Sequence, residues 1–306
     1  MQNTFVQMLM QRNKLAGMGV ALITPFKKDG TIDYDALRRL IEYQIQNGTD
    51  YFVVFGTTAE TPTLTETEKK LLFDFILAQI NGRKPVVLGL GGNCTQAVVE
   101  KIQSTDLSHV DAILSVAPYY NKPSQEGLYQ HYKKIAENSK VPIILYNVPG
   151  RTGVNISAST ILRLANDFKN IIAVKEASGN FAQIDEIIKN KPKDFMVISG
   201  DDGITFPLIT LGAVGVISVI GNAFPKEFSR MVRLALNGDY NGAREIHYRF
   251  SELIDLLFVD GNPAGVKSML SVMGFIENEL RLPLVPTTIN TFEKIRFVLN
   301  QLNTKL

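Results

Sequence analysis

Eight apolar, β-branched runs recur along the chain, and patterns of helical spacing separate them. Most of these runs are continuous rather than alternating, which is typical of parallel strands covered on both faces. They cover residues 17–25, 50–58, 85–93, 111–120, 141–150, 171–179, 194–202 and 213–221. Strand and helix alternating eight times over about 220 residues predicts an α/β fold of the (β/α)₈ TIM barrel type.

Apolar residues at helical spacing predict the helices between these strands. The patterns cover residues 35–46, 95–103, 126–138, 157–166, 182–190 and 204–211. Thr65 and Glu68 have the form of a capping box and predict where a further helix begins. A doubly wound open sheet would also alternate, but it usually carries a glycine-rich turn after its first strand. Here the glycines of GMGVAL come before that strand, which favours the barrel.

The pattern changes after residue 221, where only helix signals remain. Helices are predicted at residues 225–237, 241–258, 265–273 and 291–303. We therefore expect an N-terminal tail at 1–16, a catalytic barrel at 17–238 and a C-terminal helical subdomain at 239–306. GNPAG (261–265) and LPLVP (282–286) are interpreted as connecting segments, because proline and glycine interrupt helices.

Composition narrows the function classes. The chain has 306 residues, is 45% hydrophobic and 20% charged, and carries a net charge of +2. These values indicate an ordinary globular protein and give no sign of a nucleic-acid or membrane partner. A single cysteine, Cys94, suits a reducing cytoplasm, and the first 13 residues lack the features of a signal peptide. The histidines stand far apart, so no metal site is predicted.

Lys175 lies near the end of the apolar run IIAVKEASG, an unusual place for a lysine. Strand alternation puts it on the same face as Ala173, whose small side chain leaves room for it. Burial favours the neutral form of an amine, and a neutral amine can form a Schiff base with a carbonyl. Base rates for an isolated lysine at a strand end favour the alternative, a side chain that extends into solvent.

Active sites of such barrels lie at the carboxyl ends of the strands, and further candidate catalytic and binding residues are predicted at the same rim as Lys175. Tyr146 could act as a general acid and base that relays protons through the hydroxyl of Thr57. Arg151 could bind a carboxylate with two hydrogen bonds, and the backbone N–H groups of the Gly56–Thr58 turn could bind another. This set points to carbon–carbon bond chemistry on small keto acids.

Each signal also has a plainer interpretation. Paired threonines usually serve turn geometry, and a tyrosine in an apolar strand is usually a core residue. Asp201 and Asp202 could bind a metal, but such a pair more often caps the next helix. It is the joint placement of these residues at the ends of predicted strands that favours a site.

Five separated motifs resemble the dihydrodipicolinate synthase family, which belongs to the N-acetylneuraminate lyase superfamily of class I aldolase-like barrels. The motifs are GTTAETPTLTETEK, PYYNKPSQEGLYQHY, YNVPGRTG, VKEASGN and SGDD. The resemblance runs from about Gly17 to Leu282. It implies a cofactor-free lyase that condenses pyruvate with L-aspartate 4-semialdehyde to 4-hydroxy-tetrahydrodipicolinate, on the route to diaminopimelate and lysine.

The resemblance also implies roles for individual residues. Lys175 matches the Schiff-base lysine, and Tyr146, Thr57 and Tyr120 match the proton relay. The residue at Tyr120 reaches into a neighbouring subunit in that family, which implies a homotetramer built from tight dimers. Substrate-binding positions match here at Thr58, Arg151, Gly200 and Ile217.

The chain departs from the family pattern in two places. The usual GTTGES reads GTTAET, so Ala59 replaces a glycine that adopts positive φ freely, and the turn is expected to differ slightly. Of the family's lysine-feedback site, Asn93 and Tyr119 are present as possible regulatory residues. Ala97 and Glu66 stand where lysine-inhibited members carry Glu and His, so weak or absent inhibition by lysine is expected.

Two rival functions stay open from the sequence. Another pyruvate-dependent aldolase, such as an N-acetylneuraminate lyase, would differ in the acceptor aldehyde. Those lyases do not usually carry GRTG after YNVP and tend to have Ser-Thr where Thr57 and Thr58 stand. A catalytically idle barrel that binds a keto acid is disfavoured, because Lys175, Tyr146 and Arg151 are also present.

Overall fold

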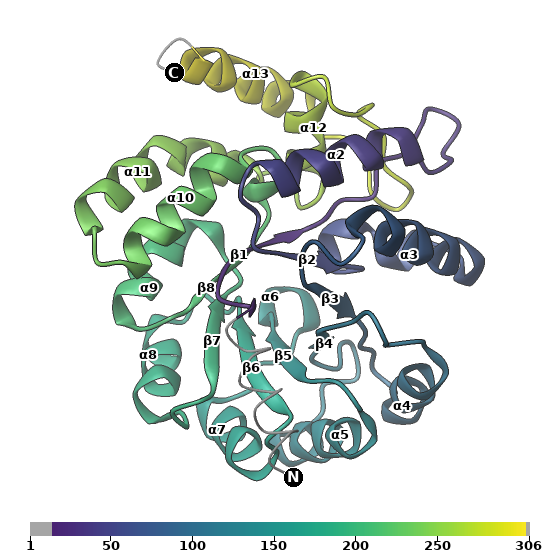
Figure 1. The fold of residues 1–306 in the computed structure, drawn as a ribbon, viewed down its shortest axis with the longest axis vertical. Coiled ribbons are helices and arrows are strands. Elements are labelled where there is room, and N and C mark those ends of the chain that lie inside the picture. The colour runs from purple at the N-terminus through teal and green to yellow at the C-terminus, as the bar shows by residue number, and fades with distance from the viewer. Residues whose placement is uncertain (1–13, 304–306) are drawn as a thin grey trace.

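Eight parallel strands close into a barrel in the order β1 to β8, with β8 pairing back to β1. The structure is a computed structural model that describes residues 14–303. The strands are β1 Gly17–Ala21, β2 Tyr51–Val54, β3 Val86–Gly89, β4 Ala112–Val116, β5 Ile143–Asn147, β6 Ile171–Glu176, β7 Met196–Ser199 and β8 Gly215–Ser218. Figure 1 shows the helices outside the strands, so the predicted (β/α)₈ barrel is confirmed.

The helices lie close to the predicted ranges. They are α2 Tyr34–Gln46, α3 Glu66–Ile80, α4 Thr95–Ser104, α5 Gln125–Asn138, α6 Pro149–Thr152, α7 Ala158–Asp167, α8 Phe181–Asn190, α9 Thr205–Leu211, α10 Pro225–Leu236, α11 Tyr240–Leu256, α12 Ala264–Val272 and α13 Ile289–Asn303. Thr65 and Glu68 form both hydrogen bonds of the expected capping box at the start of α3. Such caps satisfy N–H groups that have no partner within the helix.

The strands are shorter than the apolar runs that predicted them, because the last residues of several runs turn into short 3₁₀ helices. These are η1 Thr57–Ala59, η3 Asp202–Ile204 and η4 Ile220–Asn222, and a further short helix, η2 Thr61–Thr63, follows η1. β2 ends at Val54, and Phe55 then takes a positive φ of 59°. The apolar run therefore continues into the rim of the barrel, where the chain leaves the sheet.

Apolar packing forms shells inside and outside the barrel. The interior holds Tyr51, Ile144, Ala173, Ile198 and Ile217, which contact one another across the strands. A larger shell lies between the outer faces of the strands and the surrounding helices. A third cluster joins α10 and α11 to α12 and α13 and reaches Met18 of β1 and Val216 of β8. The helices after β8 are thus anchored on the barrel.

The C-terminal helices lie over one side of the barrel, with α13 at the top of Figure 1 beyond α2. We propose the boundary between barrel and helical subdomain at residues 238 and 239, where α10 gives way to α11. The expected N-terminal tail falls on residues 1–16, of which 1–13 lie outside the described residues.

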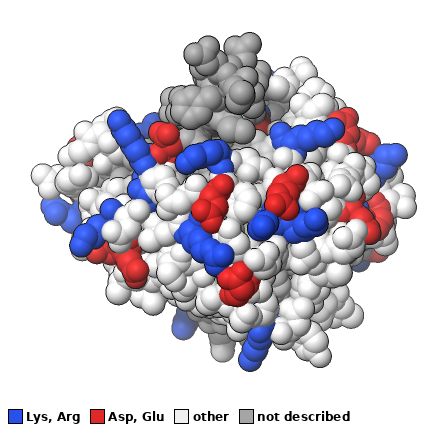
Figure 2. Space-filling view, turned by 90° about the horizontal axis from the view of Figure 1, so that it is seen from below, with Lys and Arg blue, Asp and Glu red and all other residues white. Residues whose placement is uncertain are grey.

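Charged side chains of both signs are interspersed on the face shown in Figure 2. This agrees with the small net charge of +2. Within residues 14–303 no helix is both long enough and apolar enough to cross a membrane.

Candidate active site

A pocket of about 540 Å³ opens at the carboxyl ends of the barrel strands. Its size is typical of a site for a small molecule. Of the residues predicted to act, Thr57, Tyr119, Tyr146 and Arg151 line this pocket. Asn262, Pro283 and Leu284 line it as well, so the C-terminal segment forms part of its wall.

Lys175 is buried near the end of β6, with only 6% of the residue exposed. It pairs in register with Tyr146 on β5 and with Ile198 on β7. Its Nζ atom lies 4.3 Å from the centre of the Tyr146 ring. The expectation from strand alternation is confirmed, and the alternative of a lysine extending into solvent is wrong.

Gly200 leaves the space that the Lys175 side chain occupies. A Cβ atom at position 200 would lie 3.0 Å from Lys175 Cε, 3.0 Å from the Glu176 carbonyl oxygen and 2.7 Å from Ala177 Cβ. The Gly200 N–H also donates to the Glu176 carbonyl at 2.7 Å. Any larger residue after β7 would therefore press against the lysine stem.

Glu176 fixes the ends of β5 and β6 from the opposite face of the sheet. Its fully buried carboxylate accepts a hydrogen bond from Asn147 Nδ2 at 2.5 Å and another from Ser178 Oγ at 2.5 Å. Burial raises the pKa of Glu176, and these donors act in the opposite direction. Because Asn147 and Glu176 follow Tyr146 and Lys175 directly, this contact helps to set the spacing of the latter two.

The turn after β2 carries the two threonines. Thr57 is half-buried and lines the pocket, whereas Thr58 is 2% exposed and is not part of the lining. The left-handed residue of this turn is Glu60, with φ 54° and ψ 34°, while Ala59 belongs to η1. The turn therefore accommodates alanine at 59, because the positive φ falls one residue later.

Arg151 lies on the short helix α6 after β5 and is exposed at the pocket. Its Nη2 atom donates to the backbone carbonyl of Asn262 at 3.4 Å. Asn262 Nδ2 in turn donates to Thr58 Oγ1 at 3.0 Å. Asn262 thus connects two predicted binding residues, although the sequence suggested only a linker at GNPAG. The signal for it was weak, because an Asn-Pro pair marks a turn whether or not it faces a site.

Tyr120 does not join the pocket of its own chain. It is 88% exposed and has a φ of 74°, which is uncommon for a residue other than glycine. Its neighbour Tyr119 lines the pocket, and the Tyr119 carbonyl accepts a hydrogen bond from Asn93 Nδ2 at 3.2 Å. Ile217 lies inside the barrel with 1% exposed and is not part of the pocket lining.

The two aspartates after β7 have different roles. Asp201 accepts a hydrogen bond from the Gly203 N–H and caps η3, as expected for a cap. Asp202 is buried, and its Oδ2 accepts hydrogen bonds from the N–H groups of Val219 and Ile220, both at 2.9 Å. Burial raises the pKa of Asp202 to about 6. Asp202 therefore anchors the segment after β8 rather than capping the next helix.

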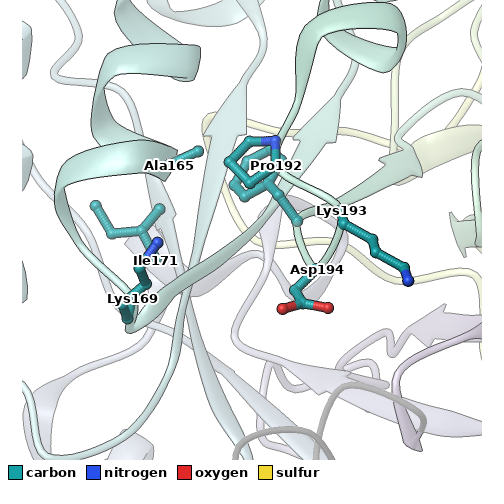
Figure 3. A pocket seen from close by; sticks show the side chains of 7 residues that line it. Ala165, Lys169, Ile171, Pro192, Lys193 and Asp194 are labelled. Carbon is teal, nitrogen blue, oxygen red and sulfur yellow. The ribbon is translucent and has the colours of Figure 1, made fainter.

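A second, smaller pocket of about 130 Å³ lies at the other end of the strands. Figure 3 shows Lys169 and Ile171 at the start of β6, facing Pro192, Lys193 and Asp194 before β7. Active sites of barrels lie at the opposite rim, so we assign no chemistry to this pocket.

Comparison with known proteins gives one consistent result. The model of the dihydrodipicolinate synthetase family matches residues 14–302. A 4-hydroxy-tetrahydrodipicolinate synthase from Parabacteroides distasonis is 70% identical over 291 residues, covering 95% of this chain and 98% of that protein.

Solved structures agree with this result. The crystal structure of dihydrodipicolinate synthase from Aquifex aeolicus is 45% identical with a TM-score of 0.91, covering 94% of this chain and 98% of that one. A chloride-inhibited dihydrodipicolinate synthase from Acinetobacter baumannii, solved in complex with pyruvate, is 40% identical with a TM-score of 0.91, covering 94% of this chain and 99% of that one.

Proposed function

This chain belongs to the dihydrodipicolinate synthetase family and is a lyase, and we propose that it catalyses its reaction through a Schiff base on Lys175. The reaction condenses pyruvate with L-aspartate 4-semialdehyde to give 4-hydroxy-tetrahydrodipicolinate, in the biosynthesis of diaminopimelate and lysine. The observation that carries the role of Lys175 is its burial at the mouth of the barrel, with Nζ over the Tyr146 ring.

The covalent step begins at the amine. The lone pair of the Lys175 Nζ atom attacks the ketone carbon of pyruvate and gives a carbinolamine. Loss of the hydroxyl as water then leaves the iminium. Removal of one proton from the methyl group gives an enamine, whose carbon attacks the aldehyde of the second substrate. The amino group of that substrate finally displaces Lys175 and closes the ring, which regenerates the free lysine.

Protons must reach and leave the carbinolamine oxygen during these steps. Tyr146 and Thr57 line the same pocket, and we assign them to this relay. Tyr120 is assigned as the third member. We propose, as the family resemblance implies, that a second copy in a homotetramer of tight dimers completes the relay; the 88% exposure of Tyr120, outside the pocket of its own chain, supports this.

Two carboxylates need partners during the condensation. Arg151, exposed at the pocket, is assigned to the carboxylate of the semialdehyde, because a guanidinium can donate two parallel hydrogen bonds. The backbone N–H of Thr58 is assigned to the carboxylate of pyruvate. Main-chain carbonyls of Gly200 and Ile217 are proposed to line the site near the lysine. No cofactor enters this scheme.

Regulation and location follow as further proposals. Asn93 and Tyr119 remain candidate regulatory residues, since the Asn93 side chain contacts the Tyr119 carbonyl beside the pocket. We place the enzyme in the cytoplasm, where its single cysteine, Cys94, would stay reduced.

Borohydride trapping tests the proposal directly. Reduction in the presence of pyruvate should add one pyruvate-derived mass to the peptide that contains Lys175, and Lys175→Ala should abolish the adduct while the protein stays folded. The absence of an adduct in the wild-type chain would refute the Schiff base. A substrate panel provides the second arm, since turnover of a different acceptor in place of aspartate semialdehyde would identify another pyruvate-dependent aldolase.

A further inference from the structure

A buried ion pair joins the turn that carries Thr57 and Thr58 to the C-terminal helices. Glu60 follows η1 directly, and its Oε1 pairs with Lys267 Nζ on α12; both side chains are 0% exposed. The other oxygen, Oε2, accepts a hydrogen bond from the backbone N–H of Arg281 at 3.0 Å. Both oxygens of this carboxylate are therefore held by residues from the far end of the chain.

The pair is part of a larger contact. Lys267 Nζ and Arg281 Cζ lie 4.2 Å and 4.4 Å from the centre of the Phe26 ring, which belongs to the loop that connects β1 to α2. Lys267 Nζ also donates to the Glu279 carbonyl at 2.9 Å. The guanidinium of Arg281 pairs with Glu68 on α3 at 2.5 Å. The turn, the loop after β1, the start of α3 and the C-terminal segment thus meet at one point.

Glu60 also carries the strained backbone of this turn. A residue other than glycine rarely adopts φ 54°, and it keeps such a conformation only where its surroundings hold it there. The Glu60 N–H donates to the Thr57 carbonyl at 3.2 Å. Movement of Glu60 would therefore shift Thr57, which lines the pocket.

Stability alone is a weak reason for such a pair. Removing two charges from water costs free energy that their attraction only partly returns, and well-packed apolar side chains often do as well. Burial lowers the pKa of Lys267 to about 8, while the carboxylate of Glu60 acts in the opposite direction. The geometry of the pair, in which both side chains are buried and paired, is therefore what it contributes.

We propose that Glu60 and Lys267 are positioning residues, which hold the Thr57–Thr58 turn at the placement that Schiff-base formation requires. This inference rests on the proposed function, because the turn is assigned there to the proton relay and to the pyruvate carboxylate. The C-terminal helices therefore contribute to catalysis through the turn.

The double variant Glu60→Gln/Lys267→Met tests this role, because it removes both charges at similar volume. The rate constant of borohydride trapping with pyruvate should fall about tenfold or more, since small displacements in a site have effects of this order. The final extent of the adduct should match the wild type. KM for pyruvate should rise, and KM for aspartate semialdehyde should stay within about threefold.

A control variant and a fallback variant test whether slower trapping comes from the position of this pair rather than from the loss of charged side chains as such. Glu293→Gln/Arg296→Met removes an exposed pair on α13, whose side chains are 45% and 56% exposed, and should leave the trapping rate unchanged. Should the double variant fail to fold, Glu60→Asp keeps the charges and withdraws the carboxylate by one methylene. It should fold and still trap pyruvate more slowly than the wild type.

The outcomes distinguish the two proposals. The positioning role would be overturned, and the proposed function would stand, if a folded double variant or Glu60→Asp kept the wild-type trapping rate and the wild-type KM for pyruvate. A drop in thermal stability without a change in these two quantities would overturn it as well. A wild-type chain that forms no adduct would overturn the proposed function and this inference with it.

Discussion

Replacing Gly200 with alanine tests whether the space beside Lys175 matters to the chemistry. The added Cβ would lie 2.7 Å from Ala177 Cβ, 3.0 Å from the Glu176 carbonyl oxygen and 3.0 Å from Lys175 Cε. Two of these neighbours are a carbonyl oxygen and a Cβ atom attached directly to the backbone, so they cannot easily move away. Overpacking of this kind typically costs about 1–3 kcal/mol of stability.

The lysine stem is the most mobile of the three neighbours, so it should give way first. A displaced Lys175 would meet pyruvate in a poorer geometry, and trapping should slow by about tenfold or more. The assay is the rate of borohydride-trapped adduct at saturating pyruvate, measured beside the free energy of unfolding in urea. Gly150→Ala is the matched control, because a Cβ at position 150 meets no atom of residues 14–303 within 4 Å. Unchanged stability together with an unchanged trapping rate in Gly200→Ala would refute the reasoning.

Three further predictions concern the site and its surroundings. Arg151→Ala should lower turnover by at least about tenfold while pyruvate trapping survives, and loss of trapping would mean that Arg151 holds the other carboxylate. Millimolar lysine should inhibit the enzyme weakly or not at all, because Ala97 and Glu66 stand where inhibited relatives carry Glu and His; strong inhibition in a steady-state assay would contradict this. The pKa of Asp202 is raised to about 6, so the folded state binds the Asp202 proton more tightly than the unfolded state does. Protonated Asp202 therefore adds to the free energy of unfolding, and this contribution is lost as the pH rises from about 4 through 6. Asp202→Asn should flatten that slope in urea titrations, and an unchanged slope would exclude Asp202 as its source.

The fold was largely predictable because its signals are local. Continuous apolar runs mark strands covered on both faces, and helical spacing marks their partners, so each element is visible within a short window. The capping box at Thr65 and Glu68 formed as expected. The ends of strands were less predictable, since apolarity alone cannot show where Phe55 turns away from the sheet.

The candidate site was predictable where the residues lie at strand ends. Thr57, Tyr146 and Arg151 all line the pocket, because parallel strands bring their carboxyl ends to one rim. Asn262 and the pair of Glu60 with Lys267 could not be predicted in this way. Their contacts join positions far apart along the chain, and no local pattern records which distant residues meet.

The placement of Lys175 shows how small residues determine a reactive position. Its side chain lies in the barrel interior with Ala173 two residues before it on the same strand, and with Gly200 beside it at the end of the next. Strand alternation already places Ala173 on the face of Lys175, but only the closed barrel shows that Gly200 borders the lysine stem. A larger side chain at position 200 would press on the lysine stem and displace the amine. We infer that the reactivity of Lys175 depends on the lack of a side chain at Gly200 as much as on the lysine itself.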